Sequence, residues 1–185
     1  MRSRLAWKLK VAVLSALAFL LMFVPAVPIF PPAPFLTYEP SEIPALVGGL
    51  LLGPSAGMAV IAVKSLLMLI YRCDPLSILG TAMNALAGVS LVGVASWRLR
   101  KNPRGVIRGI AMAVLVMTAV MVVANYFVFE LFMKLLGVSS SLSSAQYVVA
   151  FCAPFNVMKG VLSGTLGYVI FKRLSPEVDG EKQGK

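Results

Sequence analysis

Long apolar runs separated by short polar or proline-rich segments make up most of the chain. Runs of this kind are typical of helices that cross a lipid bilayer, because about 20 apolar residues span its hydrocarbon core. The pattern therefore predicts an all-α integral membrane protein with six transmembrane helices and a long proline-rich loop after the first. These helices form one domain over residues 1–175, and a polar tail follows at residues 176–185. The expected helices cover residues 5–24, 42–52, 54–71, 75–97, 106–136, and a last segment that starts at 147 or 154 and ends at 171.

The second expected helix, residues 42–52, is too short to cross a membrane. Its eleven residues, at a rise of 1.5 Å each, extend only about 16 Å, whereas the hydrocarbon core is roughly 30 Å thick. The preceding loop cannot be a regular helix, because its prolines, at positions 25, 28, 31, 32 and 34, fix φ and lack backbone donors. We expect this loop to dip into the membrane and complete the missing depth. Interruptions of this kind usually line a cavity.

The charged residues predict how these helices are oriented. The net charge is +10, but the cationic side chains cluster beside the apolar runs instead of covering a soluble surface, which argues against nucleic-acid binding. Clusters precede the first helix, separate the fourth from the fifth, and follow the last. By the positive-inside rule these places are cytoplasmic, so both termini and the tail lie in the cytoplasm and the proline-rich loop lies outside. A basic start before an apolar core also fits a cleavable signal peptide, but its removal would discard the first of these clusters.

Composition narrows the functional classes. Hydrophobic residues make up 59% of the chain and charged residues 13%, against about 45–50% and 25% in soluble domains. There is no histidine, which excludes His-based zinc sites and Ser-His or Cys-His catalysis, and there is no GxxxxGKS/T phosphate loop. We interpret Cys73 and Cys152 as small apolar residues and not as a disulfide. We expect no enzymatic activity, metal or cofactor, although a small intramembrane enzyme and a ligand-free scaffold stay open as alternative classes.

Polar side chains inside the apolar runs are the candidates for a binding site, because burying them in a bilayer is costly. Asn156 and Lys159 are three residues apart and therefore share a face of the last helix. Asn125 and Asn84 fall in the outer halves of the fifth and fourth helices, at the depth where the loop would dip. Amides and an ammonium group match a flat heteroaromatic ligand rich in carbonyl oxygens and ring nitrogens. Its apolar walls are expected from Leu36, Tyr38, Tyr126 and Phe127.

These polar residues also have structural interpretations. A single asparagine in a membrane helix often only joins two helices, at a gain of about 1 kcal/mol. Lys159 could pair with Glu130 or extend toward the membrane surface. Lys64, in the middle of the third helix, is expected to form a structural ion pair with Glu39 or Glu42.

Two motifs together resemble those of the riboflavin-specific substrate-binding subunits, or S components, of energy-coupling factor (ECF) transporters. The first, Y-x-P-S-x-x-P-A-L-x-G-G-x-x-x-G-P, runs from Tyr38 to Pro54, and the second, N-x-x-K-G, begins at Asn156. The resemblance extends over essentially all six helices. It implies a substrate-binding domain that captures riboflavin on the extracellular side of a prokaryotic cell membrane and delivers it for import, without enzymatic activity. Its partners would be a transmembrane coupling protein and two ABC-type ATPase subunits. An S component of the same architecture for another vitamin, of the thiamin or pyridoxine class, is the alternative.

The resemblance also implies roles for individual residues. Ala12 and Ala16 form a small-xxx-small pattern that permits close helix packing, either within the protein or against another one. This pattern is similar to the surface with which the family docks its coupling subunit. Asn84 has no counterpart in the two motifs and is added to the site by its depth alone. The residues implied to bind the ring are Asn125, Asn156 and Lys159, and those implied to form a gating loop are Leu36, Thr37 and Tyr38.

Overall fold

The computed structural model describes residues 2–24, 27–28, 36–137 and 142–183. The fold of these segments is all-α apart from one antiparallel pair of two-residue strands, β1 (Val27–Pro28) and β2 (Thr37–Tyr38). The helices are α1 (Arg2–Leu21), α2 (Glu42–Leu52), α3 (Pro54–Tyr71), α4 (Pro75–Lys101), α5 (Val106–Leu136), α6 (Ser144–Tyr147), the π-helix η1 (Val148–Cys152) and α7 (Ala153–Gln183).

The bounds of α2, α3 and α5 are those expected from the sequence. Helix α1 ends at Leu21 instead of residue 24, and α4 continues to Lys101 instead of residue 97. The longer α4 keeps three cations in its last turn, where they interact favourably with the helix dipole. The segments α6, η1 and α7 follow one another without a break, so the last helical stretch begins at Ser144 and continues into the polar tail. Most of the proline-rich loop, at positions 25–26 and 29–35, lies outside the described residues.

Glycine, proline and aspartate residues explain where several of the helices begin and end. Gly53, with a φ of 115°, ends α2, and Pro54 opens α3 at a position where its missing N–H breaks no helical hydrogen bond. The Asp74 carboxylate accepts a hydrogen bond from the Ser77 N–H at 2.9 Å and caps α4. Gly137, in the left-handed conformation, ends α5.

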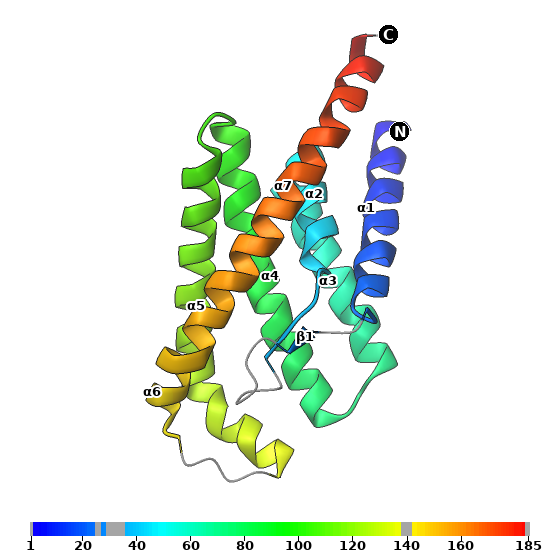
Figure 1. Ribbon diagram of the computed structural model, residues 1–185. Helices are drawn as coiled ribbons and strands as arrows, with labels where there is room; N and C mark the ends of the chain where they lie inside the picture. Colours follow the sequence, from blue (N-terminus) through cyan, green and yellow to red (C-terminus); the bar gives the residue numbers. More distant parts are fainter. Residues whose placement is uncertain (1, 25–26, 29–35, 138–141, 184–185) are drawn as a thin grey trace.

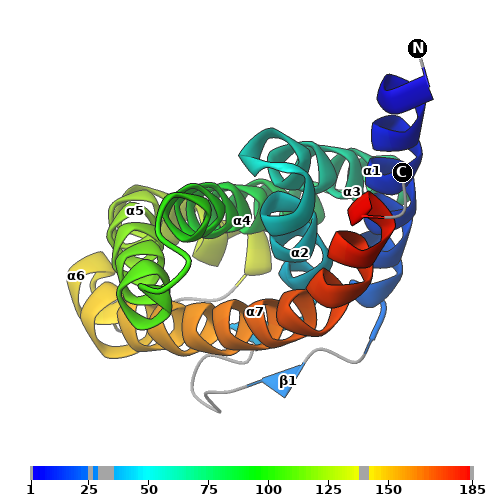
Figure 2. The same cartoon turned by 90° about the horizontal axis from the view of Figure 1, so that it is seen from above.

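Helix α2 lies in the middle of the bundle. It packs against α1, α3, α4 and α7, and Figure 2 shows it enclosed by the last three of these. Its close approach to α3 depends on glycine, because a Cβ atom at Gly57 would lie 2.7 Å from the carbonyl oxygen of Ala45. Every residue of α2 from position 44 to 50 is buried. A helix too short to span a membrane is therefore surrounded by protein over most of its length.

The two ends of the bundle differ in what they contain. The start of α1, the end of α7 and the α4–α5 turn lie together at one end (Figure 1). The α3–α4 connection, the end of α5 and the start of α6 lie at the other end, and the β1–β2 pair lies in that half of the molecule (Figure 1). Four described helical stretches are long and apolar enough to cross a membrane: α3, α4, α5 and residues 144–175.

Candidate functional site

A cavity of about 350 Å³ opens among β2, α3, α4, α5 and the α6–η1–α7 stretch. Volumes of this order are typical of sites for drug-sized molecules. Its polar lining consists of Thr37, Glu39, Arg72, Ser77, Thr81, Asn84, Asn125, Asn156 and Lys159. Its apolar lining consists of Met22, Leu36, Met68, Gly80, Met83, Ala87, Met121, Val128, Phe129, Phe132, Tyr147 and Phe155.

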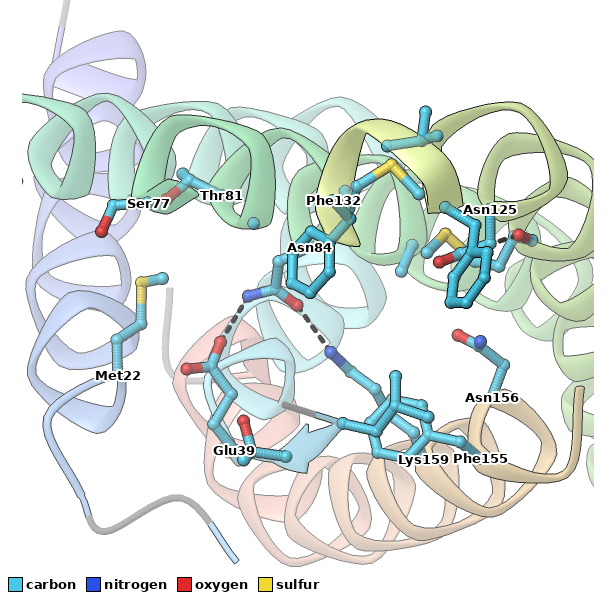
Figure 3. A pocket seen from close by; sticks show the side chains of 18 of the residues that line it. Met22, Glu39, Ser77, Thr81, Asn84, Asn125, Phe132, Phe155, Asn156 and Lys159 are labelled. Atoms are coloured by element: carbon cyan, nitrogen blue, oxygen red, sulfur yellow. Dashed lines mark hydrogen bonds between the residues drawn. The ribbon is translucent and has the colours of Figure 1, made fainter. Parts of the chain in front are cut away.

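The structure brings most of the sequence-predicted residues to this cavity. Helix α5 packs against both α4 and α7, so one polar position on each of these helices can face the same space. Figure 3 shows the side chains that converge there from separate parts of the chain. The predicted residues that line the cavity are Leu36, Thr37, Asn84, Asn125, Asn156 and Lys159.

Three predicted aromatic walls are not part of the lining. The Tyr38 hydroxyl instead accepts a hydrogen bond from the Ser163 hydroxyl at 3.4 Å. Tyr126 is 50% exposed and Phe127 is 75% exposed on the outer face of α5. Helical geometry explains why Tyr126 and Phe127 do not line the cavity. At 3.6 residues per turn, the residues that share a face with Asn125 lie three, four and seven positions further along. The aromatic side chains that α5 contributes to the cavity are accordingly Phe129 and Phe132.

Both asparagines deep in the cavity are oriented by their own helices. The Asn125 amide nitrogen donates to the Met121 carbonyl oxygen at 2.8 Å, and the Asn156 amide nitrogen donates to the Cys152 carbonyl oxygen at 2.8 Å. Each bond uses one of the two amide hydrogens. The π-helix η1 ends at Cys152, one turn before Asn156, and π-helical turns are frequent at functional sites. The sequence carried no signal for this irregular turn.

Lys159 has a different partner from the one considered from the sequence. Its Nζ atom donates to the Asn84 amide oxygen at 2.6 Å and lies 3.0 Å from Glu42 Oε1. Glu130 is exposed and takes no part in this ion pair. Figure 3 shows Asn84 between Lys159 and Glu39, with its amide nitrogen donating to Glu39 Oε1. Lys159 therefore meets the cavity as a member of a hydrogen-bonded group.

Two carboxylates were missed as site residues. Glu39 lines the cavity, and it also accepts a hydrogen bond from the Ser41 hydroxyl at 2.9 Å. Glu42 is 0% exposed and lies beside Lys159 and also 3.8 Å from Lys64 Nζ, which confirms the expected structural pairing of Lys64. In the sequence, Glu42 is an acid in the first turn of a helix, a common position for a solvated side chain. Only its ion pairs with Lys64 and Lys159 in the folded protein distinguish Glu42 from such a solvated side chain.

Ala12 and Ala16 lie on a free face of α1. Both are exposed, while Val11 and Ser15, beside them in the sequence, are buried against the bundle. Packing of this small-residue pattern within the protein, one of its two interpretations, is therefore not what the structure has. The face is available for contact with lipid or with another protein.

The described residues offer no group of three or more His, Cys, Asp or Glu side chains that could hold a metal ion. Cys73 is exposed and Cys152 is buried, and both are free thiols. The chemistry of the described lining is therefore that of amides, hydroxyl groups, the Glu39 carboxylate, two cations (Arg72 and Lys159) and aromatic walls. Such a site can bind and orient a polar flat molecule by hydrogen bonds and stacking.

Comparison with known proteins agrees with this chemistry. Residues 9–171 match the family described as "ECF transporter, substrate-specific component". The riboflavin transporter RibU of Staphylococcus aureus is 31% identical over 173 residues, which cover 89% of this chain and 88% of that protein. The riboflavin transporter FmnP of Bacillus subtilis is 29% identical, with 93% of each chain covered. A solved S component of a bacterial ECF transporter superposes with a TM-score of 0.77 at 31% identity, over 95% of this chain and 98% of that one. The match over nearly the whole length, together with the helical fold and its cavity, means that this chain belongs to the family of substrate-specific components of ECF transporters, which bind a transported substrate and are not enzymes.

Proposed function

We propose that this protein is the riboflavin-binding S component of an ECF importer. The observation that carries the proposal is the convergence of Asn125, Asn156 and Lys159 on one cavity that also has aromatic walls. Riboflavin combines a flat ring system, rich in carbonyl oxygens and ring nitrogens, with a chain of hydroxyl groups. The relatives named as riboflavin transporters support this substrate over other vitamins.

The flat ring system of riboflavin lies against Asn125, Asn156 and Lys159. Amide groups can donate to its carbonyl oxygens and accept from its N–H group, and the Lys159 ammonium can donate to a carbonyl oxygen or ring nitrogen. The rings of Phe129 and Tyr147 stack on each other with centroids 4.3 Å apart, and both line the cavity. Aromatic surfaces of this kind favour a flat heteroaromatic ligand by offset or edge-on packing. The hydroxyl chain then lies toward the polar groups near β2.

The cavity opens on the extracellular side, and both termini are cytoplasmic. The end of the bundle that contains the α4–α5 turn is rich in exposed cations, as the positive-inside rule requires of a cytoplasmic face. Leu36, Thr37 and Tyr38 form the gate over the cavity. Ala12 and Ala16 dock the transmembrane coupling protein, and two ABC-type ATPase subunits supply the energy, because this chain has no phosphate-binding loop of its own.

A riboflavin titration of the purified protein tests the proposal. Flavin fluorescence should be quenched on binding, with saturation at one riboflavin per chain. An excess of thiamin or of pyridoxine should not displace the flavin. Absence of saturable riboflavin binding would overturn the proposal, and displacement by thiamin or pyridoxine would assign the cavity to that other class of vitamin.

A further inference from the structure

Six side chains close into a ring of hydrogen bonds and ion pairs next to the cavity. Starting at the loop, Glu39 Oε1 accepts from the Asn84 amide, whose oxygen accepts from Lys159. Lys159 pairs with Glu42 Oε1, which in turn pairs with Lys64. The Lys64 ammonium donates to the Ser41 hydroxyl, and that hydroxyl donates back to Glu39 Oε1, which closes the ring. In chain order the members are Glu39, Ser41, Glu42, Lys64, Asn84 and Lys159.

The ring joins five separate parts of the fold. Glu39 and Ser41 belong to the segment between β2 and α2, and the other four members belong to α2, α3, α4 and α7. Only Glu39, Asn84 and Lys159 line the cavity. Ser41, Glu42 and Lys64 are each 0% exposed and do not line it. Half of the ring thus faces the ligand site, and half supports it from inside the protein.

The charges of the ring balance. Two carboxylates face two ammonium groups, so the network is neutral as a whole. Removing a single charge from a buried ion pair is strongly destabilising, because its partner is left uncompensated, whereas replacing both partners together is often nearly neutral. Stability and positioning can therefore be separated by experiment.

We propose that Glu42 and Lys64 are positioning residues for ligand capture. This inference rests on the proposed riboflavin function. Glu42 holds the Lys159 ammonium beside Asn84, so that this ammonium group also faces the cavity. Lys64 holds Glu42 from the opposite side and ties it to Ser41, so the ring closes only when the segment after β2 is docked. Neither residue contacts the ligand, and both act through Lys159 and Glu39.

A purely structural ion pair would have a different consequence. If Glu42 and Lys64 served only to stabilise the packing of α2 on α3, any variant that regained stability would regain affinity. If Glu42 positions Lys159, affinity stays low even where the charge balance and the stability are restored. The riboflavin affinity of a stable double variant distinguishes the two cases.

The experiment compares Glu42→Gln, Lys64→Met and the double variant Glu42→Gln/Lys64→Met with the parent. Each protein is purified in the same detergent, and its thermal unfolding midpoint and its Kd for riboflavin are measured. Both single variants should unfold at a lower temperature, and the double variant should recover much of that loss. The double variant should still bind riboflavin at least about tenfold more weakly than the parent, because a hydrogen bond to a charged group is lost. Glu42→Asp, which keeps the charge, should recover part of the affinity.

Glu130→Gln is the matched control, because Glu130 is exposed on α5 and lies outside the ring. It should change neither the midpoint nor the Kd. A parent that binds riboflavin, together with a double variant that binds it equally well, would overturn the positioning role alone. A parent that does not bind riboflavin would overturn the proposed function, and this inference with it.

Discussion

Replacing Lys159 by methionine removes the ammonium group that the described part of α7 contributes to the cavity. An ammonium group has three hydrogens. One donates to the Asn84 amide oxygen at 2.6 Å, and Glu42 Oε1 lies 3.0 Å from Nζ as an ion-pair partner. At least one hydrogen is left for a ligand. A hydrogen bond to a charged group contributes about 1.5–3 kcal/mol, and about 1.4 kcal/mol is tenfold in Kd, so the Kd for riboflavin should rise by about 10- to 150-fold.

The assay is a fluorescence titration of riboflavin into detergent-purified protein, performed well below the unfolding midpoint. This precaution is needed because Lys159→Met also leaves Glu42 with only the more distant Lys64, at 3.8 Å, as its cationic partner. The number of sites per chain should remain one, which shows that the variant is folded and only weaker in binding. Lys172→Met is the matched control, since Lys172 is exposed on the same helix and away from the cavity. A Kd for Lys159→Met within twofold of the parent would refute the reasoning.

Three further outcomes are expected. Gly57→Ala should destabilise the protein by about 1–3 kcal/mol in thermal or denaturant unfolding, because its Cβ would lie 2.7 Å from the Ala45 carbonyl oxygen; Gly93→Ala, where a Cβ meets nothing closer than 4.0 Å, should be neutral or stabilising. The double variant Ala12→Leu/Ala16→Leu should lose co-purification with the coupling protein and keep the parental Kd for riboflavin, and unchanged co-purification would contradict the docking role. Flavin adenine dinucleotide should compete poorly with riboflavin, because the hydrogen-bonded ring beside the cavity is neutral and Arg72 is the single surplus cation in the described lining for two phosphates; equal competition would contradict this.

Lys159 illustrates how far the sequence alone could predict the site. Its position three residues after Asn156 in a helix makes the shared face a consequence of helical geometry, and the structure agrees. Its partner was not predictable in the same way. Glu130 and Glu42 are both acids within reach of a membrane helix, and only the packing of α2 against α7 brings Glu42 to 3.0 Å. Distance along the chain does not decide between such partners.

The prediction of aromatic walls on α5 was wrong for a related reason. Tyr126 and Phe127, which the sequence analysis expects as walls, follow Asn125 directly, but successive helical residues point in different directions. The face that carries Asn125 continues instead to Phe129 and Phe132. The helical repeat of 3.6 residues therefore predicts both of these aromatic side chains from the position of Asn125 alone.

The sequence by itself determined the elements of this protein. Apolar runs, prolines and glycines set the helices and the break at Gly53, because these signals act through local backbone geometry and through the length needed to cross a bilayer. The site was decided by the tertiary structure. A short α2 surrounded by its neighbours places the buried Glu42 between Lys64 and Lys159, and this arrangement arises only when the helices pack together. Buried charges must find partners in space, and no pattern along a single chain specifies which partners those are.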